Sequence, residues 1–306
     1  MENKDRIVYV ILCGVIAVWG LNVVMVKYLA FFPPVLIAAI RMSVAAIALL
    51  PIVFWKTEKP DLNRKDWLYI GAVGITSITL HQILLAWGIQ QTTAGTASLI
   101  LGLNPLATAV VAIPLLGEKL TRRKSLGIAL GFGGVLLVVS SNSQGISFTG
   151  WGDLIVFVSM LMYVAGGILI RRATGRGVPV LAVTAYSHAI ASVILWITAL
   201  IVYPTEVFTQ IDTRPFTWGV IATSAIFSSA IGTLGWNYGI RQLGAGRTAI
   251  FLNGMPLASL LFAAVLLGEQ LHLYHLLALM MIISGVYLGT QKQATLQIPA
   301  QLSKSG

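Results

Sequence analysis

The sequence NPLATAVVAIPLLGEKL at residues 104–120 returns 151 residues later as MPLASLLFAAVLLGEQL at residues 255–271. Each copy is an apolar run with a proline in its second position and a Leu-Gly-Glu turn near its end. A run of this kind, extended by the apolar residues before it, reaches the roughly 20 residues that a helix needs to cross a bilayer. The repetition predicts two related halves that each carry an equivalent interrupted membrane helix.

Ten apolar stretches of sufficient length follow one another along the 306 residues. They are Ile7–Ala30, Pro33–Phe54, Trp67–Ile89, Thr93–Leu116, Ser125–Ser140, Trp151–Ile170, Pro179–Tyr203, Phe216–Gly239, Gly244–Leu267 and Tyr274–Thr290. Helices are the structure expected for them, because the open edges of a sheet leave backbone groups unpaired in lipid. The predicted fold is an all-α polytopic membrane protein with ten transmembrane helices.

The composition excludes several other classes of protein. Hydrophobic residues make up 57% of the chain and charged residues 10%, against roughly 45–50% and about 25% in soluble domains. So few charges cannot cover a soluble surface or line a nucleic-acid groove, so we expect neither a cytosolic enzyme nor a nucleic-acid partner. The single cysteine, Cys13, rules out an internal disulfide. No nucleotide loop, HExxH or GxSxG motif occurs, and we expect no cofactor, no metal and no catalytic residue.

The distribution of positive charge predicts the orientation. Of the 20 Lys and Arg residues, 17 fall at the termini or in connections that lie on one side of the ten spans. The other side holds only Lys27 and Arg214, and Arg41 lies inside the second span. Because basic loops remain in the cytoplasm, both termini are expected there.

The internal repeat extends beyond the two quoted runs. At the same shift Trp67 corresponds to Trp218, and Gly95 corresponds to Gly246. The halves are expected to span residues 1–145 and 146–306, with five helices each. Five is odd, so the two halves enter the membrane in opposite orientations, which is a common plan of secondary transporters.

The two interrupted helices indicate where a ligand can bind. Pro105 and Pro256 lie near the middle of the fourth and ninth spans, and each removes a backbone donor and kinks its helix. Paired interruptions in corresponding helices point to a midplane site between the halves. Asn104 and Asn253 lie beside the prolines, where an amide can bind a polar ligand or satisfy the kinked backbone.

Ionisable residues inside spans are the next candidates. His81 lies fourteen residues past Trp67, roughly 21 Å from the cytoplasmic end of its helix. An ionisable group at that depth is a functional-site candidate, although a hydrogen bond to a neighbouring helix is the alternative explanation. His188 is a second candidate for a proton or pairing role. Arg41, roughly 12 Å deep, is a third, and it can snorkel outward or pair with an acid.

Uncharged aromatic and amide side chains complete the candidate site. Trp19 and Asn22 are three residues apart, so they share a helix face near mid-membrane. Tyr163 lies in the middle of the sixth span, which the repeat pairs with the first. Each of these side chains can line a cavity or pack between helices. No Asp or Glu lies deep inside a span, which favours facilitated transport or proton coupling through His81 over a carboxylate proton carrier.

The sequence resembles the EamA-type transporters of the drug/metabolite transporter superfamily. The resemblance rests on Trp19-Gly20-x-Asn22 with Arg41, on Asn104-Pro105 followed by Leu116-Gly117-Glu118, and on the repeat of the second motif. It implies a ten-helix basket in a bacterial cytoplasmic membrane and export of amino acids or related metabolites. Aromatic amino-acid exporters of this family carry a histidine in the third helix, which His81 matches. Gly166-Gly167 departs from the pattern where Trp-Gly and Asn would repeat.

The leading hypothesis is therefore a secondary transporter that exports small metabolites, foremost amino acids, by alternating access. Alternatives are a carrier of other organic solutes or drugs, a lipid enzyme and a channel. A lipid enzyme would need a polar cluster at one membrane face, and only His272 and His275 near Glu269 come close. Two GxxxG motifs, Gly127–Gly131 and Gly285–Gly289, allow close helix packing within the bundle, so a monomer is expected.

Overall fold

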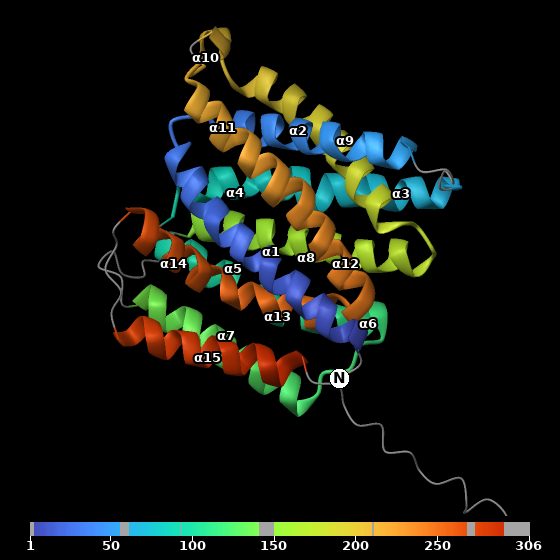
Figure 1. Cartoon of the computed structure of the whole chain (residues 1–306), viewed down its shortest axis with the longest axis vertical. Coiled ribbons are helices and arrows are strands. Elements are labelled where there is room, and N and C mark those ends of the chain that lie inside the picture. The colour runs from blue at the N-terminus through green and yellow to red at the C-terminus, as the bar shows by residue number, and fades with distance from the viewer. Residues whose placement is uncertain are drawn as a thin grey trace, which may run out of the picture.

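The structure, a computed structural model, describes residues 3–55, 61–92, 94–140, 150–209, 211–267 and 273–290, which form helices joined by short connections (Figure 1). The first half contains α1 (Asn3–Tyr28), α2 (Pro34–Trp55), α3 (Arg64–Val73), η1 (Gly74–Leu80), α4 (His81–Ile89), α5 (Ala94–Gly102), α6 (Asn104–Leu116) and α7 (Arg122–Ser140). The second half contains α8 (Trp151–Gly175), α9 (Val180–Val202), α10 (Thr205–Thr209), α11 (Pro215–Thr223), η2 (Ser224–Gly232), α12 (Thr233–Leu243), α13 (Ala245–Ile250), η3 (Phe251–Gly254), α14 (Met255–Leu267) and α15 (Leu273–Thr290).

Within the described part of the chain these helices run through the bundle ten times, and we call each run a crossing; this confirms the predicted all-α polytopic fold. Seven helical stretches are long and apolar enough to span a membrane by length and composition. The remaining three crossings are α5–α6, which is split at Leu103, and the shorter helices α7 and α15. The sequence did not predict α10, a short helix in the connection before α11. The predicted boundary between residues 145 and 146 lies outside the described residues.

The helices pack mainly between the two halves. Helix α2 lies against α9, α7 against α15, α1 against α14, and α4 against α8. Figure 1 shows the α2–α9 pair at one edge of the bundle and the α7–α15 pair at the other. The second span thus pairs with the seventh and the fifth with the tenth, which are equivalent positions of the repeat. Equivalent helices of the two halves therefore lie against each other in these two pairs.

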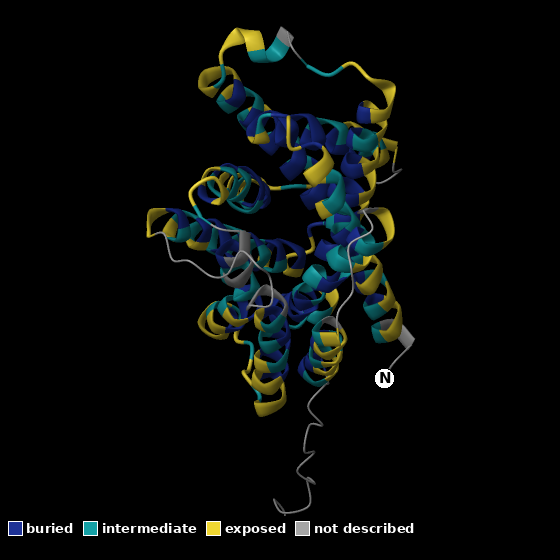
Figure 2. Cartoon of the chain, turned by 90° about the vertical axis from the view of Figure 1, so that its left-hand side faces the viewer, coloured by how far each residue is buried: buried dark blue, intermediate teal, exposed yellow. Residues whose placement is uncertain are grey.

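Apolar side chains also cover the outer surface, as a lipid environment requires. Ile201 is 78% exposed and Val265 is 81% exposed. Figure 2 shows such exposed residues on the outer faces of helices whose inner faces are buried. A large contiguous apolar surface of this kind would favour aggregation of a soluble protein, whereas in a bilayer it faces the acyl chains.

Close contact between α7 and α15 depends on glycine. A β-carbon at Gly127 would lie 2.5 Å from the carbonyl oxygen of Gly285 and 2.6 Å from the Cα of Gly289. The two GxxxG motifs therefore pack against each other within one chain, which agrees with the predicted close packing within the bundle.

Three arginines at the end of α8 hold one end of the bundle together. Arg171 donates to the carbonyls of Ile240 and Arg241 at the end of α12. Arg172 donates to the Leu115 carbonyl of α6 over 3.1 Å, and Arg176 donates to Asp66 of α3 over 3.1 Å. We call this end, where α3 begins and α6, α8 and α12 end, the basic end; it is the end predicted to be cytoplasmic.

Candidate functional site

Four crossings have irregular backbone, and they are equivalent in pairs. The third and eighth crossings contain the π-helical segments η1 and η2. The fourth is interrupted between α5 and α6, next to Pro105, and the ninth contains the 3₁₀ segment η3 immediately before Met255-Pro256. Single π-turns inside helices are frequent at functional sites. Both halves therefore bring two irregular helices to the region that the sequence predicts to hold a ligand.

Two hydroxyl side chains of η1 donate hydrogen bonds to backbone carbonyls of α3. Thr76 donates to the Ala72 carbonyl over 2.7 Å, and Ser77 donates to the Val73 carbonyl over 2.9 Å. Such bonds to the preceding turn bend helices. The run of Ser and Thr inside an apolar span is thus the sequence signal for η1 that the prediction did not use.

His81 is the first residue of α4, directly after η1, and its ring faces α8. Its Nδ1 lies 2.9 Å from Ser159 Oγ and 3.1 Å from the Ser159 carbonyl oxygen. The Ser159 hydroxyl also lies 2.9 Å from the His81 carbonyl, to which it donates. This arrangement favours the tautomer with the proton on Nδ1, which leaves Nε2 as an acceptor with no hydrogen-bond partner among the described residues.

Tyr163 lies one helical turn beyond Ser159 on α8 and contacts His81. The two ring centroids are 5.1 Å apart, and the rings are tilted by 50°. The Tyr163 hydroxyl is buried and has no hydrogen-bond partner among the described residues. Leaving such a group unpaired costs about 1–3 kcal/mol, so this hydroxyl is available to a bound molecule. The structure thus brings together two of the predicted residues from different halves.

Trp19 and Asn22 both contact η2. The Trp19 indole Nε1 donates to the Ser228 carbonyl over 3.1 Å, and Ser224 Oγ donates to Asn22 Oδ1 over 2.5 Å. The ring of Trp19 also packs on Trp236, with centroids 5.1 Å apart. The Trp19 indole N–H and the Asn22 amide oxygen are therefore both bonded to the irregular helix η2.

Asn104 and Asn253 differ in their surroundings although they flank equivalent prolines. Asn104 accepts a hydrogen bond from Thr108 within α6 over 3.1 Å. Both amide atoms of Asn253 are buried without a partner among the described residues. Its side chain points at Gly131 of α7, where an added β-carbon would overlap Nδ2. Asn253 therefore faces α7, whereas His81 and Tyr163 lie between α4 and α8.

Arg41 and His188 belong to a separate buried group between α2, α9 and η2. Arg41 is 8% exposed and donates to Ser229 over 3.0 Å. Among the described residues it has no carboxylate partner, so it neither snorkels outward nor pairs with an acid. His188 Nδ1 contacts the Thr184 carbonyl of its own helix at 2.7 Å.

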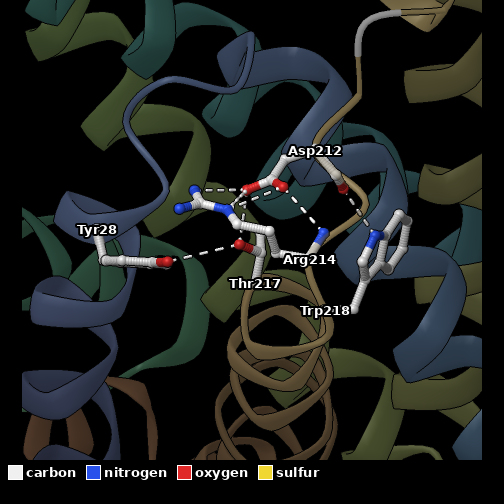
Figure 3. Close-up of polar contacts among 5 residues, drawn as sticks. All are labelled: Tyr28, Asp212, Arg214, Thr217 and Trp218. Atoms are coloured by element: carbon white, nitrogen blue, oxygen red, sulfur yellow. Dashed lines mark hydrogen bonds and ion pairs between the residues drawn. The ribbon is translucent and has the colours of Figure 1, made fainter.

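A polar cluster ties α1 to α11 at the end opposite the basic end (Figure 3). Arg214 Nε donates to both oxygens of Asp212, at 3.0 and 2.8 Å, and Thr217 Oγ1 donates to Asp212 over 2.7 Å. The Tyr28 hydroxyl, at the end of α1, lies 3.5 Å from Thr217 Oγ1. The hydrogen bonds from Arg214 hold the pKa of the Asp212 carboxyl well below its usual range.

The remaining sequence candidates add no site. Glu269 and His272 lie outside the described residues, and so do the side-chain surroundings of His275. Among the residues that the structure describes, no group of three metal-ligating side chains occurs. Sequence reasoning did not single out Ser159, which bonds His81, because a single serine in an apolar span carries no pattern of its own.

Comparisons with known proteins identify the class and then the family. The sequence model of the EamA-like transporter family matches residues 6–140 and again residues 150–290. The chain belongs to this family of the drug/metabolite transporter superfamily. It is 32% identical over 289 residues to a Bacillus subtilis (strain 168) protein named uncharacterized transporter YyaM, covering 92% of this chain and 93% of that protein.

Two further comparisons bear on function and fold. The chain is 28% identical over 270 residues to a probable terminal-alkyne amino-acid exporter of Streptantibioticus cattleyicolor, covering 83% of this chain and 86% of that protein. A crystal structure with 16% sequence identity superposes with a TM-score of 0.81 and covers 93% of this chain and 96% of the other. That likeness shows a shared fold.

Proposed function

We propose that this protein is a secondary transporter that exports small metabolites, foremost amino acids, from the bacterial cytoplasm by alternating access. The observation that carries the proposal is the contact between His81 and Tyr163, because it joins the two halves beside the π-helical segment η1 and presents an unpaired, buried hydroxyl. Both termini lie in the cytoplasm, and the protein works as a monomer.

The chemistry of the site favours an amphipathic, uncharged or zwitterionic substrate. His81 Nε2 and the Tyr163 hydroxyl offer hydrogen bonds, and the aromatic rings of Tyr163 and Trp19 offer an apolar surface. The amide oxygens of Asn22 and Asn104 already accept hydrogen bonds from Ser224 and Thr108, and Asn253 faces α7. The proposed polar contacts are therefore those of His81 and Tyr163. An amino acid with an apolar or aromatic side chain fits this combination, and the relative named as an amino-acid exporter supports the same substrate class.

The interrupted helices provide the flexible points that alternating access needs. Breaks at Pro105 and Pro256 let the two halves of the fourth and ninth crossings change direction independently, and the inverted repeat offers two equivalent arrangements, one open to each side. His81 or His188 carries any proton that is coupled to transport, because no carboxylate lies deep in a span.

Transport by purified protein in liposomes tests the proposal. A panel of radiolabelled amino acids, together with organic cations and nucleotide sugars, is loaded on one side and its exit is timed. We expect saturable exit of at least one amino acid, which Tyr163→Phe and His81→Ala slow by about tenfold or more. Tyr287→Phe, which changes a tyrosine of α15 that is 66% exposed, is the matched control and should leave the rate unchanged.

Three results would contradict the proposal. Exit of only drugs or nucleotide sugars would overturn the amino-acid assignment. Conductance that does not saturate would indicate a channel. Equal rates for wild type, Tyr163→Phe and His81→Ala would remove these residues from the site.

A further inference from the structure

A cavity of about 430 Å³ opens at the basic end and is built by both halves. Its walls come from the connection between α6 and α7, the end of α8, the junction of α12 and α13, and the end of α15. The charged residues of its lining are Glu118, Lys119, Lys124, Arg171 and Arg247. The volume is in the range of small-molecule sites, which are about 300–1,000 Å³.

One wall of the cavity is a fixed ion pair. Lys124 Nζ lies 3.0 Å from Glu118 Oε2, and the Lys124 side chain is only 7% exposed. Glu118 also accepts from the backbone N–H of Gly246 over 3.4 Å, which joins the first half to the start of α13. Glycine is needed at 244 and 246, because a β-carbon there would lie 2.8 Å or less from a Glu118 oxygen. This pair is neutral overall and leaves the other cations of the cavity uncompensated.

The other three charged residues of the lining are all basic. Arg171 donates to the Ile240 and Arg241 carbonyls, so it serves the end of α12, where a cation is favourable. The side chains of Lys119 and Arg247 make no hydrogen bond or ion pair with a described residue. One belongs to the first half and one to the second. The cavity therefore holds two cations that no described group neutralises.

We propose that this cavity binds an oxyanion of the phosphate class, the headgroup of an anionic phospholipid or a free phosphate ester, through Lys119 and Arg247. Arginine and lysine are the usual phosphate-binding side chains. Basic pockets between transmembrane helices near the cytoplasmic surface bind phospholipid headgroups. Arg171 already has a structural role, because it bonds the carbonyls at the end of α12. No described residue accepts a hydrogen bond from the side chain of Lys119 or Arg247.

A bound phosphate group has a structural consequence. It contacts both halves at the end where the α8 arginines already bond α3, α6 and α12, so it stabilises that arrangement relative to one in which the halves separate there. The site lies apart from His81 and Tyr163, so the inference goes beyond the proposed transport function and does not depend on it.

Binding to the purified full-length protein in neutral detergent tests the inference without any transport measurement. The thermal unfolding midpoint is followed against inorganic phosphate, against short-chain phosphatidylglycerol, and against phosphatidylcholine of the same chain length at constant ionic strength. We expect phosphatidylglycerol, inorganic phosphate or both to raise the midpoint with saturation, and phosphatidylcholine not to. A response to the lipid alone identifies a headgroup site, and a response to inorganic phosphate identifies a site for a free ester.

Two double variants separate the cavity from general electrostatics. Lys119→Gln with Arg247→Gln should weaken the apparent affinity about 25-fold, taking about fivefold per basic residue near a membrane surface. Arg64→Gln with Lys65→Gln removes the same charge at the same end, outside the cavity, and should leave the affinity unchanged. Arg247→Lys, which keeps the charge, should retain most of the binding and shows that the site tolerates substitution there.

The inference fails if neither probe raises the midpoint of the wild-type protein. It also fails if the two double variants weaken binding equally, because the effect would then be one of net charge. If a variant does not fold, native mass spectrometry of the wild type compares the retention of phosphatidylglycerol with that of phosphatidylcholine. Equal retention of both lipids, together with no response to inorganic phosphate, overturns the proposal.

Discussion

Replacing Gly127 by alanine is expected to separate α7 from α15. The new methyl group would lie 2.5 Å from the Gly285 carbonyl oxygen and 2.6 Å from the Gly289 Cα, whereas ordinary contact begins at 3.4 Å. Both neighbours are backbone atoms and cannot rotate away, so the helices must move apart by about 0.9 Å. Gly285→Ala should have the same effect, because its methyl group would lie 2.6 Å from the Gly127 carbonyl oxygen.

The size of the effect follows from how helices associate in lipid. Forcing one methyl group into a packed interface costs about 1–3 kcal/mol. Helix association in a membrane depends on close packing and hydrogen bonds, with little hydrophobic contribution to compensate for lost contact. We therefore expect Gly127→Ala to lower the free energy of unfolding by about 1–3 kcal/mol, which corresponds to a drop of several degrees in the unfolding midpoint.

The assay is unfolding in mixed micelles by titration with SDS, with the thermal midpoint in neutral detergent as a second measure. Gly14→Ala is the matched control, because no atom lies within 4 Å of the methyl group that it adds to α1. That control should be neutral or stabilising by up to about 1 kcal/mol through helix propensity. If Gly127→Ala unfolds at the same midpoint as Gly14→Ala, the argument that backbone contact holds α7 to α15 is wrong.

Ser159→Ala is expected to lower stability by about 1–2 kcal/mol and to slow transport, because His81 loses the hydroxyl that orients its ring; transport at the wild-type rate would contradict this role. Trp19→Phe leaves a carbonyl of η2 unpaired and should cost about 1–3 kcal/mol in SDS titration, whereas unchanged stability would mean that the carbonyl finds another donor. Arg214 lowers the pKa of Asp212, so this contact is fully present above the ordinary carboxyl pKa of about 3.9 and is lost only as the pH falls through the lowered value. The difference in unfolding midpoint between wild type and Asp212→Asn should therefore stay constant from about pH 8 to about pH 5, and a difference that disappears near pH 6 would refute the argument.

The interruptions of the fourth and ninth crossings could be predicted because their cause is local. A proline has no backbone donor, so Pro105 and Pro256 mark a break wherever they occur inside a helix. The π-helical segment η2 could not be predicted in this way. Its Ser228 carbonyl is satisfied by Trp19, a residue 209 positions away in the chain, and no local pattern encodes that partner.

In the candidate site, too, some features follow from the local sequence and others depend on distant partners. Depth along a helix selects His81 and Tyr163 as polar groups inside the membrane, and this requires only counting residues. Their contact, between α4 and α8, depends on how the halves dock. Asn253 was predicted with them because it lies beside Pro256 in the second interrupted helix, but its side chain faces Gly131 of α7.

The sequence by itself determined the number of crossings, the inverted repeat and the side that carries the positive charge. The crossings and the charged side follow from the composition of segments of about 20 residues and of their flanks, since insertion into lipid depends on one segment at a time. The repeat follows from comparing residues 151 positions apart. Only the tertiary structure decided which polar groups are used and which are free. The Trp19 indole is bonded to η2 and the Tyr163 hydroxyl is left unpaired. The partner of each such ring has to come from a neighbouring helix, and the docking of the helices decides whether one is within reach.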